Sequence, residues 1–192
     1  QGQISPHFLY NTLNSIKWMA AVMKANNIVK GLTALGNLLR PIYKNSSSLA
    51  SVREEMDYLQ NYIMIMNFRY GEGINVQFHV DEEVQSLQML RFILQPLIEN
   101  SIIHGMESRN HMGHIDVYAH KAGHELHITI KDDGCGVSAI HLKELRNRIN
   151  DHSSLDETDG SFGIGLRNVN QRLKLHYGQQ CGLELTSKEG EG

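Results

Sequence analysis

The chain has 192 residues, of which 41% are hydrophobic, and a formal net charge of −3. This length and apolar content suit one large domain or two small ones with real cores. The charge excludes the basic footprint expected of a protein that binds nucleic acid or an anionic membrane. Cys135 and Cys181 lack CxxC spacing, which is typical of reduced thiols rather than of a disulfide framework.

The first 70 residues have the apolar spacing of amphipathic helices. Apolar residues recur every three or four positions from residue 3 to about residue 43, with a break at Asn26-Asn27 and a kink or end at Pro41. Ser51 and Glu54 have the S-x-x-E spacing of a capping box and open a third helix, which ends at Gly71. The exposed apolar stripe favours a helical hairpin that pairs with a second copy of the chain.

His7 lies in the first turns of this helical region. It follows Pro6, which a helix tolerates only in its first turn or at a kink. Asn11 and Asn14 lie four and seven residues later, on the same helix face. A neutral imidazole has a free ring nitrogen and is a usable nucleophile. A histidine near a helix start can also be hydrogen-bonded and inert, so the interpretation depends on whether the chain carries a phosphate donor.

After Gly73 the pattern changes to strands that alternate with helices. The sequence predicts, in order, a strand, a long apolar helix, two strands joined by a tight turn, a helix, an acidic loop, a helix capped by Gly178 and a last strand. These elements cover residues 74–80, 87–106, 114–120, 124–131, 140–149, 150–159, 163–177 and 181–187. We therefore expect an α+β protein with a helical domain over residues 1–72 and a two-layer α/β domain over residues 73–192.

The helix expected over residues 87–106 carries Glu99, Asn100 and His104 among apolar residues. Buried polar groups are costly unless they are satisfied. An asparagine carbonyl oxygen is a natural ligand for Mg²⁺, which keeps most of its water and bridges to phosphate. Polar residues that only cap a neighbouring element are about as common in such helices, so both interpretations stay open.

Asp132, Gly134 and Gly136 form a D-x-G-x-G turn at a strand end. The carboxylate there can accept a hydrogen bond from an exocyclic amine such as that of adenine, and the glycines permit a tight turn and close approach of a ligand. Asp-Gly turns are common, so the motif alone is weak evidence. A Ca²⁺ loop is excluded because Asp132 and Asp133 have no further carboxylates at ligand spacing.

Residues 160–166 form a glycine-rich loop that leads into a helix. Free N–H groups and the helix dipole make such a start suitable for an anion, including a polyphosphate. The loop lacks the Lys-Ser/Thr of a P-loop and the G-x-G-x-x-G spacing of a dinucleotide site. A purely structural helix start is an equally good interpretation of this loop alone.

Taken in this order, the motifs resemble those of a sensor histidine kinase. The segments PHFLYN (6–11), LQPLIENSIIHG (94–105) and GIGLRNVNQRL (163–173) are similar to the LytS/YehU (YesM-like) histidine kinase family, whose catalytic part is a GHKL-type ATPase domain. The resemblance covers nearly the whole chain. It implies ATP and Mg²⁺ as cofactors, a homodimer through the N-terminal helices and a response regulator, a transcription factor, as the partner.

The resemblance also implies roles for single residues. His7 would be the phosphoacceptor with Asn11 as its polar neighbour, and Glu99 would polarise the attack or hold metal through water. Asn100 would be the Mg²⁺ ligand and Asp132 would read adenine. The nucleotide pocket would be completed by His104, Gly134, Gly136, Gly163, Ile164, Gly165 and Leu166. Residues 137–162 would form a mobile ATP lid, and Asn168 and Arg172 would be structural or lie near phosphate.

Three departures from the family pattern matter. Ile103 stands where related helices often carry a basic residue, and Phe8 follows the histidine where the larger kinase class places an acid. The family's final strand lies beyond Gly192. We expect a cytoplasmic fragment of a protein that is anchored in the cell membrane upstream of this chain.

Other functions are possible for such a chain. A non-catalytic nucleotide-binding scaffold is one alternative, because Ile103 replaces a basic residue that could contact phosphate. A GHKL ATPase that releases phosphate to water is another, and in it Glu99 would have to activate the water. A metal site could use several histidines of the strand region, but on alternating strands we expect them to point to different faces, so a solvated face is the better interpretation. These residues are His111, His114, His120, His124 and His127.

Overall fold

The computed structural model describes residues 6–43, 47–150 and 163–192. The chain forms two compact units. The first comprises Gln1–Gly73 and Gln85–Arg91, and the second comprises Ile74–Val84 and Phe92–Gly192. The segment 85–91 therefore returns to the first unit after the chain has begun the second.

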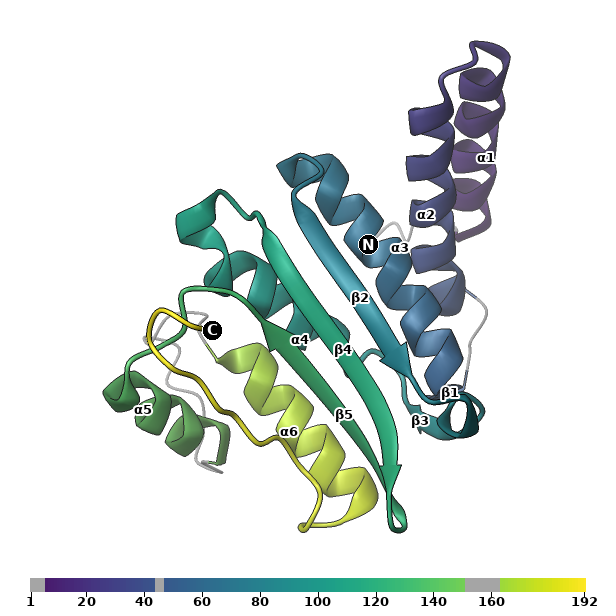
Figure 1. The fold of residues 1–192 in the computed structure, drawn as a ribbon. Coiled ribbons are helices and arrows are strands. Elements are labelled where there is room, and N and C mark those ends of the chain that lie inside the picture. The colour runs from purple at the N-terminus through teal and green to yellow at the C-terminus, as the bar shows by residue number, and fades with distance from the viewer. Residues whose placement is uncertain (1–5, 44–46, 151–162) are drawn as a thin grey trace, which may run out of the picture. The chain divides into compact units, whose positions relative to one another are not determined.

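Three helices build most of the first unit (Figure 1). Helix α1 (Pro6–Val22) packs along α2 (Asn26–Tyr43), and α2 packs along α3 (Val52–Tyr70). The predicted break between the first two helices is a turn in which Lys24 has a φ of 56°. Pro41 lies within α2, and the helix ends two residues later at Tyr43.

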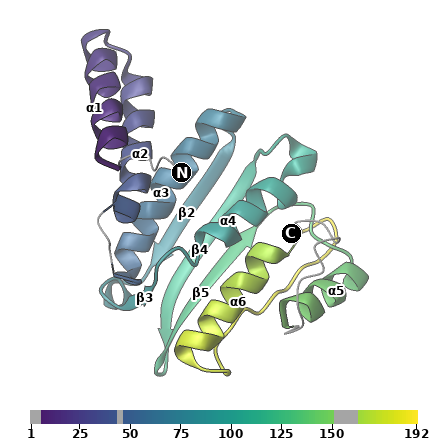
Figure 2. The same ribbon diagram turned by 180° about the vertical axis from the view of Figure 1, so that it is seen from behind.

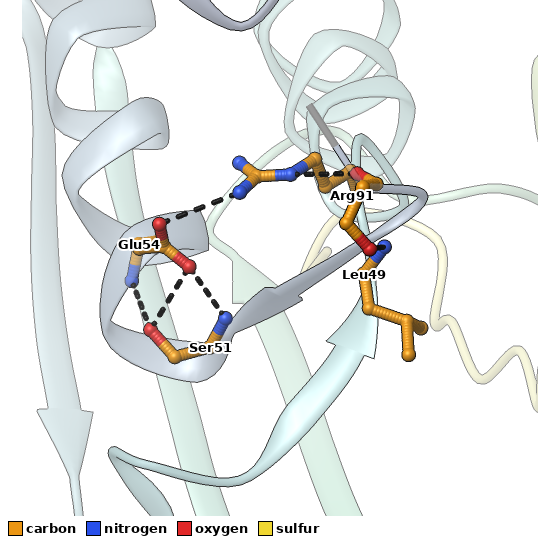
Figure 3. A network of polar contacts seen from close by, with 5 residues as sticks. Leu49, Ser51, Glu54 and Arg91 are labelled. Carbon is orange, nitrogen blue, oxygen red and sulfur yellow. Dashed lines mark hydrogen bonds and ion pairs between the residues drawn. The ribbon is translucent and has the colours of Figure 1, made fainter. Parts of the chain in front are cut away.

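The N-terminus of α3 has the predicted capping box (Figure 3). The backbone N–H of Glu54 donates to Ser51 Oγ at 3.2 Å, and the backbone N–H of Ser51 donates to Glu54 Oε2 at 2.8 Å. Arg91 adds an ion pair to Glu54 Oε1 at 3.3 Å. The Ser51 N–H, and to a smaller degree Arg91, lowers the pKa of the Glu54 carboxyl.

A short antiparallel pair of strands completes the first unit. Strand β1 (Leu49–Ser51) pairs with β3 (Gln88–Leu90), with Ala50 opposite Met89. The apolar pattern of residues 87–106 predicts one long helix, and that prediction is wrong for residues 88–90. The helix begins only at Gln95, where Pro96 occupies its first turn, as a residue without an N–H can.

The second unit contains a three-stranded sheet in the order β2-β4-β5. Strand β2 (Ile74–Val80) runs parallel to β4 (Gly113–Ala122), which is antiparallel to β5 (Glu125–Asp132). Helices α4 (Gln95–Asn100) and α6 (Ile164–Tyr177) lie over one face of this sheet (Figure 2). The unit is completed by the short turns η1 (Glu82–Val84) and η3 (Glu107–Arg109), the π-helical turn η2 (Ser101–Gly105) and helix α5 (Ala139–Asn150).

The two faces of this sheet differ in polarity. Ile115, Val117 and Ala119 of β4 are buried on the face that the helices cover, as the alternation of side chains in a strand dictates. The opposite face carries the polar positions of the three strands, including His79, Tyr118 and His127. A second hydrophobic cluster joins α5 to α6 through Leu145, Ile149 and Leu166.

The predicted last strand over residues 181–187 is absent; these residues form no strand in the structure. Their backbone is held by side chains instead. Leu183 N–H donates to Asn170 Oδ1 at 2.9 Å, and the Arg146 guanidinium donates to the carbonyl of Leu185 at 2.9 Å. Across the described parts of the chain, none of the helices combines the length and apolar character needed to cross a bilayer.

Candidate functional site

Asp132 is the last residue of β5 and lies on the helix-covered face of the sheet. It has the same parity along the strand as Ile128 and Ile130, so its side chain points toward the helices. Its Oδ2 accepts a hydrogen bond from Ser101 Oγ at 2.7 Å, and its Oδ1 accepts one from the Gly134 N–H at 3.0 Å. The carboxylate is therefore held by one donor on each oxygen.

The D-x-G-x-G turn closes directly against the π-helical turn Ser101–Gly105. The Cys135 N–H donates to the Gly105 carbonyl at 2.8 Å. A Cβ on Gly134 would lie 2.5 Å from that same carbonyl oxygen, so only glycine fits this approach. Gly136 has a φ of 61°, a conformation that glycine adopts without strain. Both motif glycines thus have a structural reason to be glycine.

Asn100 ends α4, immediately before the π-helical turn. The side chain is half-buried, and its Nδ2 is enclosed without a hydrogen-bond partner among the described residues. Because Nδ2 is closed off, the carbonyl oxygen Oδ1 is the end of the amide left to meet a ligand. An oxygen donor of this kind fits a Mg²⁺ ligand. Glu99 and His104 are also half-buried in this segment.

The N-terminus of α6 is the third part of the site. Gly163 is its N-cap with a φ of 90°, and among the described residues no side chain caps the first turn. The first N–H groups of such a helix have no partner within the helix, which favours an anion. Gly165 lies against α4, since a Cβ there would be 3.6 Å from Pro96 Cβ. Ile164 is partly exposed, whereas Leu166 is buried in the cluster with Leu145, so only its backbone could face a ligand.

The second unit therefore brings together helix α4, which ends at Asn100, the Asp132 turn and the N-terminus of α6. Two contributors were missed by the sequence analysis. Ser101 was missed because a serine in an apolar helix gives no signal of the residue that it bonds to. Gly105 was missed because it was considered only as the last residue of the segment 94–105. A glycine directly after a buried helix was the available clue to a close approach.

Asn170 was also missed, although it is the polar residue that joins three segments. It is 1% exposed, and its Nδ2 donates to the Ile149 carbonyl at 3.0 Å while its Oδ1 accepts the Leu183 N–H. Its neighbour Asn168 is exposed, and Arg172 donates to the Phe92 carbonyl at 3.4 Å. Asn170 thus fixes the end of α5 and the C-terminal segment around α6.

His7 belongs to the first turn of α1, in the other unit. Its side chain lies outside the described residues, so its surroundings are not assigned. Asn11 lies one turn later on α1 and is exposed, and its carbonyl accepts a hydrogen bond from Ser15 Oγ. Of the segment expected to form a lid, residues 151–162 lie outside the described residues, and the preceding part is mostly helix α5.

The strand histidines do not point to different faces, and that prediction is wrong. His114 and His120 share one face of β4 because they are six residues apart, and the register places His127 of β5 opposite His120. On this open face Asp116 accepts from His79 Nε2 at 2.8 Å and lies 3.2 Å from His114 Nε2. The hydrogen bond from His79 lowers the pKa of the Asp116 carboxyl, and His114 adds to the effect.

No group of three or more histidine, cysteine, aspartate or glutamate side chains in the described residues could hold a metal ion. His111, the remaining histidine of the suggested set with an assigned contact, bonds through Nδ1 to the Ile102 carbonyl at 2.9 Å. His79, His111, His114, His120 and His127 are therefore engaged in local contacts.

Comparison with known proteins matches this architecture to two families. The family model of histidine kinases matches residues 1–74, and that of histidine kinase-, DNA gyrase B- and HSP90-like ATPases matches residues 86–192. The histidine kinase domain of the blue-light activated histidine kinase from Erythrobacter litoralis EL346 aligns with a TM-score of 0.50 over 97% of this chain and 89% of that one. At 15% sequence identity this similarity concerns the fold alone.

The chain is also similar in sequence to sensor kinases. It is 34% identical to the sensor histidine kinase YesM of Bacillus subtilis over 100% of its own length, and 29% identical to the sensor protein kinase HptS of Staphylococcus aureus over 99%. It spans only 31% and 35% of the lengths of these two relatives. From its two family matches, the chain belongs to the sensor histidine kinases with a GHKL-type ATPase domain.

Proposed function

We propose that this chain is the kinase portion of a two-component sensor, which uses ATP to phosphorylate His7 and passes the phosphoryl group to an aspartate of a response regulator. The observation that carries the proposal is the Asp132 carboxylate, held by Ser101 and Gly134 at the helix-covered edge of the sheet. It lies in the same unit as the Asn100 helix and the uncapped start of α6.

The residues of the second unit suit the parts of a bound nucleotide. Asp132 would accept a hydrogen bond from the 6-amino group of adenine, next to the turn formed by Gly134 and Gly136. The free N–H groups at the start of α6 would bind phosphate oxygens. Asn100 Oδ1 would hold Mg²⁺, which offsets phosphate charge during phosphoryl transfer.

The transfer itself would need mainly correct positioning. A neutral ring nitrogen of His7 forms a bond to the γ-phosphorus while the bond to the bridging oxygen breaks, and ADP leaves. Asn11, one helical turn away, is the polar neighbour for the imidazole, and Glu99 would polarise the attack. The phosphohistidine is then consumed when an aspartate of the response regulator takes its phosphoryl group.

The first helix has features that support a homodimer. Phe8, Ile16 and Met19 follow one face of α1 at spacings of eight and three residues, and Met23 follows directly after the helix; each is at least 44% exposed. A large exposed apolar stripe on a helical hairpin is typical of a helix-bundle interface. We also propose that the longer protein is anchored in the cell membrane, with this portion in the cytoplasm.

The test is incubation of the purified chain with γ-labelled ATP and Mg²⁺. We expect a protein-bound label that acid removes and base does not, and we expect His7→Gln to abolish it. His120→Gln is the matched control, because His120 lies on the open face of the sheet and should leave labelling unchanged.

Two other results would contradict the proposal. Nucleotide binding without any label would favour the non-catalytic scaffold, which the absence of a basic residue at Ile103, in the π-helical turn, would support. Steady release of phosphate by the His7→Gln protein would favour a GHKL ATPase with Glu99 as the group that activates water.

A further inference from the structure

We propose that Ser101 is a positioning residue that sets the preference of this site for a 6-aminopurine by fixing the orientation of Asp132. This inference rests on the proposed function, since it assumes that Asp132 meets the base. It concerns a residue that no motif in the sequence singles out. It also explains why a hydroxyl side chain occupies a buried position in a mostly apolar helix.

The geometry around Ser101 supports this role. The side chain is 8% exposed, and its Oγ lies 2.7 Å from Asp132 Oδ2, a separation typical of a short bond from a hydroxyl to a carboxylate. Buried hydroxyls are costly unless paired, and this is the pairing that the structure provides. The other oxygen, Oδ1, is taken by the Gly134 N–H at 3.0 Å, so the carboxylate plane is fixed from both ends.

The π-helical turn places Ser101 for this contact. Ser101 is its first residue and Gly105 its last, and both ends are bonded to the same loop, through Asp132 and through the Cys135 N–H. A π-helical turn inserts one residue relative to an α-helix and often occurs at functional sites. A Cβ on Gly105 would lie 3.0 Å from Asp132 Oδ1, so the turn is packed closely against the carboxylate.

A fixed carboxylate is selective because it only accepts hydrogen bonds. A 6-amino group donates to it, whereas a 6-oxo group presents an acceptor and is repelled. The terminal torsion of an aspartate is soft, so a carboxylate without the Ser101 hydroxyl can rotate away from the amine. Contacts to the ribose and phosphates do not depend on that torsion. Loss of the hydroxyl should therefore weaken binding only for a base that carries the amine.

The experiment measures the dissociation constants of ATP and of purine riboside triphosphate, which lacks the 6-amino group, by titration calorimetry with Mg²⁺. For Ser101→Ala we expect about a five- to tenfold weaker affinity for ATP and an unchanged affinity for the analogue. Ser101→Thr keeps the hydroxyl and should retain most of the preference for ATP. Ser86→Ala, at an exposed serine of the first unit, is the matched control.

The outcomes separate this inference from the proposed function. If Ser101→Ala weakens both ligands equally, or neither, Ser101 does not act through the amine and the inference is wrong. If Asp132→Asn loses the preference while Ser101→Ala keeps it, the adenine site stands and only the role of Ser101 falls. If the unmodified chain shows no preference for ATP over the analogue, the adenine site and the inference are both wrong.

Discussion

Asp132 and Asp116 lie on adjacent strands of one sheet, but on opposite faces. Asp132 is on the helix-covered face, where it accepts from Ser101 Oγ and the Gly134 N–H. Asp116 is on the open face, between His79 and His114. Each carboxylate is thus held by two groups, and only the surroundings distinguish a proposed ligand site from a surface ion pair.

The surroundings differ in two physical respects. The partners of Asp132 are a hydroxyl and a backbone N–H, which do not titrate near neutral pH, and its side chain lies on the face of the sheet that the helices cover. The partners of Asp116 are imidazoles, and the ring of Tyr118 stacks on His79 at a centroid distance of 4.5 Å. Asp116 therefore belongs to a cluster of side chains on the open face of the sheet.

The sharpest way to break this comparison is to remove each carboxylate in turn. For Asp132→Ala we expect ATP affinity to fall about 10- to 100-fold, because a charged acceptor for the base is lost. Asp116→Ala should leave ATP affinity unchanged. Calorimetric titration measures both, with circular dichroism to show that each variant is folded. Asp132→Asn keeps the shape and serves if the alanine variant does not fold. Equal losses for the two positions would contradict the assignment.

A second comparison concerns two glycines of the same unit. A Cβ on Gly134 would lie 2.5 Å from the Gly105 carbonyl oxygen, whereas one on Gly113 would first meet the movable side chains of Asp133 and Met106 at 2.6 and 2.8 Å. Backbone cannot give way as side-chain ends can. We expect Gly134→Ala to lower the free energy of unfolding by about 1–3 kcal/mol and Gly113→Ala to cost less.

Urea unfolding of the two alanine variants measures the difference. Gly134→Ala should also weaken ATP binding, because the turn moves away from the Asp132 carboxylate. A larger destabilisation by Gly113→Ala would show that the contact between the Gly134 turn and Gly105 is not a tight one.

Local signals in the sequence were sufficient for much of the fold. Ser51 and Glu54 predicted their capping box because both partners are three residues apart. Gly163 and Gly178 predicted both ends of α6 because the conformation of a cap depends on the residue itself. The α+β class followed from the change of apolar period after Gly73.

Features that depend on distant partners were not predictable in this way. Residues 88–90 have an apolar pattern that suits a helix, but pairing with Leu49–Ser51 makes them a strand. Ser101 and Asn170 have their partners 31 and 13 residues away, and no local pattern identifies such a pair. The shared face of the histidines required the strand register, which the sequence analysis did not work out.

The smallest expected effect tests the open face by pH. The pKa of Asp116 is lowered in the folded protein from an ordinary value of 3.8, mainly by the hydrogen bond from His79. A lowered pKa means that the ionised carboxylate stabilises the fold above about pH 4, and that this contribution is lost as the pH falls through the folded-state pKa.

The measurement is the urea midpoint of unfolding of Asp116→Asn and of the unmodified chain at pH 5.5 and at pH 3. We expect the variant to be slightly less stable at the higher pH, and we expect this difference to become smaller at the lower pH, where the carboxyl begins to be protonated. The effect is small because the ion pair is open to solvent and screened. Asp81→Asn, at an exposed carboxylate of the same unit, is the control. A difference between Asp116→Asn and the unmodified chain that grows on acidification would have the wrong sign for a carboxyl with a lowered pKa. It would mean that the imidazoles do not hold Asp116 in its charged form. The difference between Asp116 and Asp132 could then not be explained by their hydrogen-bonding partners.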